Sequence, residues 1–185
     1  MKFKLLFIFC ILILNSIVVS SSNSSSEVEY SNYPVPQKTD KLLFYLQRTH
    51  NKNTIVYEAN YLADGKLNPS EPVHVSWIRY EEGGSKAELS YIQKHAFGFS
   101  FHITDRAKES YTLNFNNFKK KDIYLQKSGD KYVAYMIINS KLSELRKLFI
   151  KSENNSLGFP IVVKYIDVFG VDYINGNNVS ERIIP

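Results

Sequence analysis

Residues 72–104 have the sequence PVHVSWIRYEEGGSKAELSYIQKHAFGFSFHIT, which predicts a strand, a glycine turn, a short helix and a second strand. In the first strand, alternation sends successive side chains to opposite faces of a sheet. One face receives Val73, Val75, Trp77 and Arg79, and the other receives His74, Ser76, Ile78 and Tyr80. Gly83 and Gly84 then end the strand, because glycine adopts backbone angles that other residues resist.

A short helix is expected over about residues 86–97. Ser85 and Glu88 have capping-box spacing, in which each residue satisfies a free backbone N–H of the other at a helix start. Gly98 is placed to end the helix. The strand that follows has apolar side chains along one side, namely Phe97, Phe99, Phe101 and Ile103.

Further strands are expected where β-branched and aromatic residues lie between turn residues. They cover residues 42–49, 54–62, 110–118, 122–127, 131–139, 146–152 and 161–171. The first two of them, and the two that flank residues 128–130, should form hairpins. About nine short strands and one helix indicate an all-β, mainly antiparallel single domain. Periodicity leaves a β-sandwich and a flattened barrel open as alternatives.

Residues 1–20 have the pattern of a secretory signal peptide. Two lysines precede a run of mostly apolar residues, and Val18 and Ser20 suit the positions that a signal peptidase reads. The run is shorter than the ~20 residues that a membrane-spanning helix needs. We therefore expect cleavage near Ser20 and a secreted or cell-envelope protein, with an uncleaved anchor as the alternative.

Residues 21–40 are rich in serine and contain Pro34 and Pro36, which indicates a flexible leader before a single domain over residues 41–185. The only cysteine, Cys10, lies in the predicted signal peptide, so the mature domain relies on packing without disulfides. Three glycosylation sequons, which matter only in a eukaryotic source, begin at Asn23, Asn154 and Asn178.

The formal charge is mildly positive. Subtracting the charges of Lys2 and Lys4, which the predicted signal peptide removes, from the total of +5 leaves +3. That balance is too small to favour nucleic acid or an anionic membrane as a partner. Outside the signal peptide the sequence has no apolar run long enough to span a bilayer. We therefore expect neither nucleic acid nor, beyond the signal, a membrane as a partner.

Three segments, LFYLQRTHNKNTIVYEANY, PVHVSWIRYEEGG and LSYIQKHAFGF, together resemble an uncharacterised family of exported proteins, the domain of unknown function DUF4833. The resemblance covers roughly residues 41–171, and its most specific part is the Trp77-Ile78-Arg79 strand followed by residues 89–98. It implies a secreted or envelope-associated domain. It implies no catalytic residue, cofactor or substrate.

Trp77 and Arg79 are the leading candidates for a ligand site. On one face of a strand, an indole can stack on a ligand while a guanidinium binds its carboxylate or phosphate. Tyr80 follows them directly and is included as a candidate. The structural alternative is that Arg79 sits at a sheet edge and pairs with Glu81, Glu82 or another acid.

Asp167 is the fourth candidate, because Tyr165 and Phe169 share its face of a strand and would bury its carboxylate. A buried carboxylate is commonly paired with an arginine, and Arg79 is a possible partner. Other acids available for catalysis are Glu58, Asp105, Glu109 and Asp122. The sequence has no nucleophile elbow, phosphate-binding glycine loop or dinucleotide fingerprint, and it identifies no catalytic residue.

Metal and cofactor sites are not expected. The four histidines, at positions 50, 74, 95 and 102, lack the close spacing that metal ligands show on one element, and no cysteine is available in the mature chain. The favoured hypothesis is a non-enzymatic binding module for a small molecule, a glycan or a protein. Two alternatives stay open: a hydrolase or transferase that uses Asp105, Asp167 and Arg79, and a structural domain of an envelope or matrix.

Overall fold

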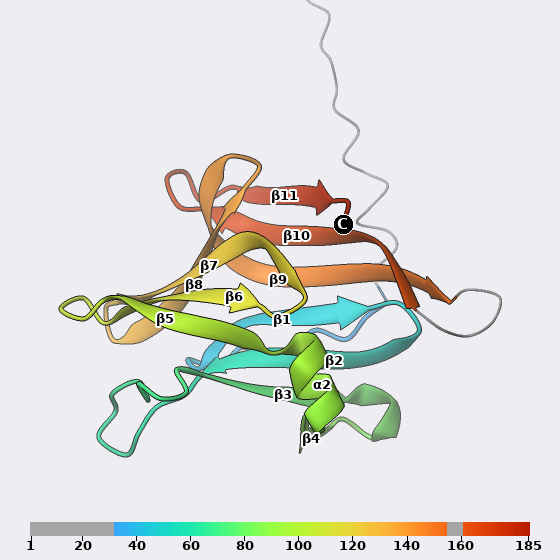
Figure 1. Ribbon diagram of the computed structural model, residues 1–185, viewed down its shortest axis with the longest axis horizontal. Coiled ribbons are helices and arrows are strands. Elements are labelled where there is room, and N and C mark those ends of the chain that lie inside the picture. The colour runs from blue at the N-terminus through green and yellow to red at the C-terminus, as the bar shows by residue number, and fades with distance from the viewer. Residues whose placement is uncertain (1–31, 155–160) are drawn as a thin grey trace, which may run out of the picture. The chain divides into compact units, whose positions relative to one another are not determined.

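A computed structural model describes residues 32–154 and 161–185 of the chain. These described residues form eleven strands, one α-helix and one 3₁₀ turn (Figure 1). In chain order these are β1 (Leu42–Arg48), β2 (Asn51–Ala59), β3 (Val73–Arg79), η1 (Tyr80–Glu82), β4 (Ser85–Glu88), α2 (Tyr91–Phe97), β5 (Phe99–Asp105), β6 (Ser110–Phe115), β7 (Phe118–Ser128), β8 (Lys131–Ile138), β9 (Lys141–Asn154), β10 (Ile161–Asp172) and β11 (Asn178–Ile183).

The sheet forks at β9, the longest strand. One edge of β9 pairs with β10, and the other edge is shared by β8, at residues 141–144, and by β1, at residues 147–150. From this fork the strands β1–β4, which we call the N-terminal leaf, and the strands β5–β8, which we call the middle leaf, extend as separate arms of one curled half-barrel (Figure 1). The all-β, mainly antiparallel fold with one short helix is thereby confirmed.

The two leaves bury a common aromatic core. Phe44 on β1 stacks on Tyr57 of β2, with ring centroids 4.4 Å apart. Phe115 of β6 meets both rings edge-on, at 6.3 and 5.7 Å. Edge-to-face and stacked contacts at these distances are the arrangements that aromatic rings prefer. Because the rings come from both leaves, the core holds the arms of the fork together.

One pair of strands departs from the antiparallel pattern. Residues 45–48 of β1 run parallel to residues 147–150 of β9. The long stretch of chain between these strands lets β1 approach β9 in this direction, whereas a hairpin joins only antiparallel neighbours. Strand β9 is also longer than predicted, because it begins at Lys141 and includes residues before 146 that the sequence does not assign to a strand.

The helix begins later than the sequence indicates. Residues 85–88 form β4, which pairs with residues 76–79 of β3, so the predicted capping box at Ser85 and Glu88 is wrong. The capping box lies at Ser90 and Gln93 instead: the Ser90 hydroxyl accepts from the Gln93 backbone N–H at 3.4 Å, and the Gln93 side chain accepts from the Ser90 backbone N–H at 2.8 Å. Strand pairing with β3 satisfies backbone groups of residues 85–88 that a helix start would leave free.

The turn before β4 and the end of α2 lie where the sequence predicts them. Gly83 and Gly84 have φ of 81° and 78°, in the left-handed region that glycine adopts freely. Gly98 ends the helix at an ordinary φ of −75°, and its role is steric. A Cβ at Gly98 would lie 2.2 Å from the carbonyl oxygen of Lys94, so a side chain there would displace the helix end.

At the N-terminus, packed residues already occur before β1. The ring of Tyr33 meets Phe149 of β9 edge-on at 5.4 Å, and the carbonyl oxygen of Pro34 accepts a 2.8 Å hydrogen bond from the buried Gln47 side chain. The predicted signal peptide and the Asn23 sequon lie outside the described residues, as do most of the residues that form the Asn154 sequon. Asn178 is exposed at the start of β11.

Candidate functional site

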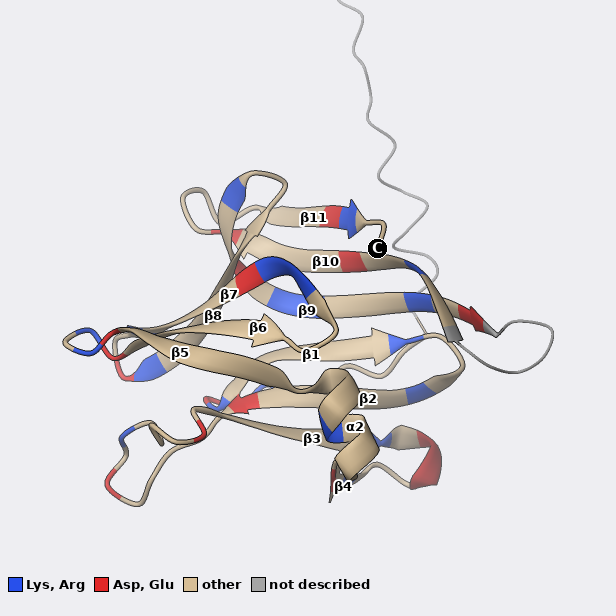
Figure 2. Ribbon diagram, in the orientation of Figure 1, with Lys and Arg blue, Asp and Glu red and all other residues tan. Residues whose placement is uncertain are grey.

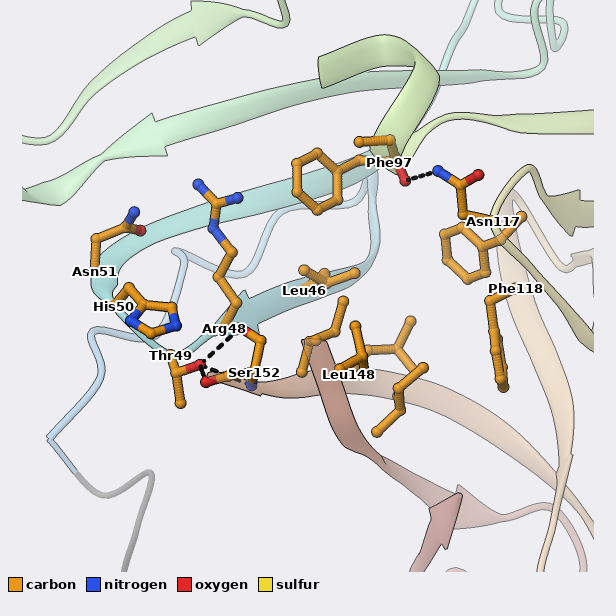
Figure 3. A pocket seen from close by; sticks show the side chains of 15 residues that line it. Leu46, Arg48, Thr49, His50, Asn51, Phe97, Asn117, Phe118, Leu148 and Ser152 are labelled. Carbon is orange, nitrogen blue, oxygen red and sulfur yellow. Dashed lines mark hydrogen bonds between the residues drawn. The ribbon is translucent and has the colours of Figure 1, made fainter. Parts of the chain in front are cut away.

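A cavity of about 440 Å³ opens where the two leaves diverge from β9. Its wall is supplied by β1 and the β1–β2 turn, the end of α2, the β6–β7 turn, β9 and β10 (Figure 3). Fifteen residues line it: Leu46, Arg48, Thr49, His50, Asn51, Ala96, Phe97, Phe115, Asn117, Phe118, Leu148, Ile150, Ser152, Val163 and Ile166. None of these lining residues is an Asp or Glu.

The floor of the cavity is apolar and continuous with the core. Leu46 and Leu148 face each other across the parallel β1–β9 pair, and Ile150 and Ile166 face each other across β9 and β10. In Figure 3, Leu46 and Leu148 lie in the middle of the view, between the β1–β2 turn on one side and Phe118 on the other. The space exists because β9 leaves β8 after residue 144, and side chains of the β6–β7 turn do not fill the widening gap.

Three of the six polar lining residues, Thr49, Asn117 and Ser152, are engaged with protein partners. The Thr49 hydroxyl lies 3.0 Å from the Ser152 hydroxyl and accepts the Ser152 backbone N–H at 2.9 Å. The Asn117 amide donates to the carbonyl oxygens of His95 and Ala96, both at 3.3 Å, and so ties the β6–β7 turn to α2. These bonds fix the rim, because they join β1 to β9 and α2 to the middle leaf.

Arg48 stands out among the lining residues. Its guanidinium lies 5.1 Å from the centre of the Phe97 ring, within the range of a cation–π contact. The side chain is half-buried, and burial lowers the pKa of the guanidinium below its ordinary value. Within residues 32–154 and 161–185, no carboxylate forms an ion pair with Arg48 and no hydrogen bond from its side chain is present.

His50 follows Arg48 by two residues, in the tight β1–β2 turn, and also lines the cavity. Its φ is 83°, a left-handed conformation that a non-glycine residue adopts at some cost in energy. Its side chain is exposed, and it lines the cavity next to Asn51 (Figure 3). The turn therefore presents two nitrogen-bearing side chains beside Arg48.

The structure places Trp77 and Arg79 together but outside the cavity lining. The Arg79 guanidinium lies 5.2 Å from the Trp77 ring, and it forms a 3.0 Å ion pair with Glu82 in η1. Trp77 packs against the core beside Ile55, its cross-strand neighbour. Within the described part of the chain, Trp77 Nε1 and Arg79 Nε are buried without a hydrogen-bond partner. Tyr80 begins η1, and its binding role, like that of Trp77 and Arg79, stays a prediction.

Asp167 is paired with Arg182, so the prediction that Arg79 is its partner is wrong. Asp167 is 3% exposed on β10, and Arg182 of β11 faces it in the strand register. Two nitrogens of the guanidinium donate to the two carboxylate oxygens, each at 2.7 Å. Figure 2 shows the acidic band of β10 beside the basic band of β11. A cross-strand neighbour supplies the partner because the two side chains point to the same face of the sheet.

The other acids that the sequence offers for catalysis also have partners of their own. Asp105 pairs with Lys108 at 3.6 Å, Glu109 pairs with Lys127 at 3.2 Å, and the Asp122 carboxylate accepts the Asn114 amide. Glu58 pairs with Lys86. Asp105, Asp167 and Arg79 each form an ion pair with a different residue, namely Lys108, Arg182 and Glu82.

The histidines are dispersed. His74 lies 3.0 Å from Glu88, His95 is exposed on α2, and His102 is exposed on β5. In the part of the chain that the structure describes, no three His, Cys, Asp or Glu side chains are close enough to hold a metal ion. Within the same residues, no helix has the length and apolar character needed to cross a bilayer.

Sequence reasoning missed Arg48 and the cavity. A signal was present, because Arg48 follows Leu46 at two-residue spacing and so shares its core-facing side of β1. A charged side chain on the core-facing side of a strand needs another group nearby to compensate its charge. The partner residues on β9, β10 and the β6–β7 turn are remote in sequence, and only the fork in the sheet brings them to Arg48.

No curated protein matches the chain, and no solved structure does. The sequence profile of the family described as domain of unknown function (DUF4833) matches residues 44–182, which include every residue of the cavity lining. The chain belongs to the DUF4833 family.

Proposed function

We propose that this domain is an exported, non-enzymatic binding module that takes up a small, largely apolar molecule in the cavity at the fork. The observation that carries the proposal is the cavity itself, about 440 Å³ in volume, with an apolar floor and a few polar groups at its rim. Small-molecule sites typically have volumes of about 300–1,000 Å³ and this division between apolar lining and sparse polar groups. The predicted signal peptide supports the exported location.

Binding is favoured over catalysis by the composition of the lining. A hydrolase or transferase based on acids would need a carboxylate facing its substrate. None of the described residues that line the cavity is an Asp or Glu, and the acids that the sequence offers for catalysis are engaged elsewhere. A purely structural domain is less well supported, because filling the floor with larger side chains would stabilise such a domain.

The test is a titration of the mature protein with Nile red, an uncharged dye whose fluorescence rises in apolar surroundings. Val163 lines the cavity and is 37% exposed, so Val163→Trp should fill the opening without straining the core. Val162 is the adjacent residue, is 44% exposed and does not line the cavity. Val162→Trp is therefore the matched control.

We expect saturable Nile red binding to the wild type and to Val162→Trp, and binding at least about tenfold weaker to Val163→Trp, a loss of about 1.4 kcal/mol. Circular dichroism should show the same sheet content in all three proteins. Equal binding by both variants would refute the cavity as the site, as would a wild type that does not bind the dye.

A further inference from the structure

At the rim, the polar groups that already have protein partners differ in hydrogen-bonding character from those that have none. The Thr49 and Ser152 hydroxyls bond to each other, and the Asn117 amide is committed to α2. The Asn51 side-chain oxygen accepts the backbone N–H of Asn53 at 3.2 Å. What stays uncommitted at the rim, within the described residues, is the Arg48 guanidinium, the Asn51 amide nitrogen and the His50 ring. The free groups are thus predominantly hydrogen-bond donors.

The surroundings of Arg48 leave its charge poorly compensated. A charge removed from water is costly unless an opposite charge or hydrogen bonds replace its hydration. The face of the Phe97 ring, 5.1 Å away, provides partial compensation. Among the described residues, no acid lines the cavity and none pairs with Arg48. Arg79 and Arg182, which also lie over aromatic rings, each have a carboxylate partner as well.

We propose that the ligand of the cavity is an anionic amphiphile, whose carboxylate or similar head group is held by Arg48 and whose apolar body lies on the floor formed by Leu46, Leu148 and Ile166. This proposal rests on the proposed function, since it names the class of molecule that the same cavity takes up. A planar guanidinium donates two parallel hydrogen bonds to a carboxylate, a geometry that an uncharged head group does not reproduce.

The arrangement also orients the ligand. Arg48 is the last residue of β1 and lies next to the exposed turn, whereas Leu46 lies two residues earlier and is 4% exposed. The head group therefore sits near solvent and the body points inward. Asn51 is directly opposite Arg48 in the β1–β2 register, so its free amide nitrogen is available to a second oxygen of the head group.

The experiment uses three probes with the same ten-carbon chain and different head groups: decanoate, decanol and decylamine. Isothermal titration measures their binding to the wild type, to Arg48→Met and to Arg106→Met. Arg106 is exposed in the β5–β6 turn and does not line the cavity, so Arg106→Met is the matched control for the loss of one arginine.

We expect decanoate to bind the wild type and Arg106→Met about tenfold to a hundredfold more tightly than decanol, the range set by one charge-assisted hydrogen-bonded contact. In Arg48→Met this preference should vanish, through loss of decanoate affinity while decanol affinity is retained. Decylamine should bind most weakly to the wild type.

Other outcomes separate this inference from the proposed function. Equal binding of decanoate and decanol to the wild type, or an unchanged preference in Arg48→Met, would overturn the anionic ligand and leave the binding cavity in place. Binding of Nile red without binding of any ten-carbon probe would do the same. Failure of all probes, the dye included, would overturn both. Should Arg48→Met not fold, Arg48→Gln replaces it, and the order of the three probes on the wild type decides the inference alone.

Discussion

The hydroxyl of Tyr57 on β2 donates a 2.8 Å hydrogen bond to the carbonyl oxygen of Phe97, the last residue of α2. Tyr57 is fully buried, and burial raises the pKa of its hydroxyl far above the ordinary value, so the group stays a donor at any practical pH. The bond joins the N-terminal leaf to the helix whose end forms one wall of the cavity. Phe97 also packs against the core through its side chain.

Tyr57→Phe should therefore affect both stability and binding. We expect a loss of about 1–2 kcal/mol in the free energy of unfolding, because the variant leaves a carbonyl without its donor. Nile red affinity should fall as Phe97 loses its fixed position. Urea unfolding and dye titration measure the two effects. Tyr111→Phe is the control, since Tyr111 is buried but its hydroxyl has no bond in the described chain, and its stability change should be near zero.

Because Asp167 and Arg182 form an ion pair, we expect substitutions of the two residues to have non-additive effects on the free energy of unfolding. Arg182→Met should destabilise the domain by about 2 kcal/mol, less than the loss typical of a fully buried pair because the Arg182 side chain is 44% exposed. In the background of Asp167→Asn, the same substitution should cost clearly less, because no buried carboxylate is then left behind. Urea unfolding of the two single variants and the double variant gives the coupling energy. Additive losses would show that the pair contributes little.

Because the pKa of Lys147 is lowered in the folded protein, we expect the free energy of unfolding to rise at alkaline pH. Its ammonium lies near the rings of Phe149 and Phe169, at 5.9 and 5.6 Å, and burial lowers its pKa to about 8, against the opposing effect of Asp167. Because the folded value lies below the ordinary 10.5, the unfolded chain binds more protons between pH 8 and 10.5, and stability rises with pH across that window.

Substitution of Lys147 by Met removes this dependence. The difference in unfolding free energy, wild type minus Lys147→Met, should be most unfavourable below about pH 8 and should increase steadily toward pH 10.5. Taking the difference cancels the titration of the tyrosines that both proteins share. Urea unfolding at a series of pH values across this window measures it, and a flat difference would mean that Lys147 titrates at its ordinary pH.

Trp77→Phe tests the site that the sequence alone suggested. The variant keeps a ring beside Arg79 and removes the buried Nε1–H, which has no partner in the described chain. We expect the free energy of unfolding to change by no more than about 1 kcal/mol. The smaller ring loses packing contacts, but removal of a buried N–H without a partner recovers part of that loss. Nile red and decanoate affinity should not change, since Trp77 is outside the cavity lining. A marked loss of affinity in this variant would place the ligand at Trp77 and Arg79.

Several features of the fold follow from local chemistry. The two-residue alternation from Val73 to Arg79 predicts β3, and the left-handed glycines at 83 and 84 predict the turn after it. Both depend on neighbouring residues only. The start of the helix is ambiguous for the same reason: Ser85-x-x-Glu88 and Ser90-x-x-Gln93 both fit a capping box, and pairing of residues 85–88 with β3 decides between them.

The sequence by itself determined that this is a β-rich domain with one short helix, and family membership follows from the same residues. Tertiary structure alone decided the fork at β9, the partner of Asp167 and the position of Arg48 over an apolar cavity. The physical reason is that periodicity assigns a side chain to a face, whereas the groups that meet it there come from strands remote in the chain, and their register is set by the packing of the whole sheet.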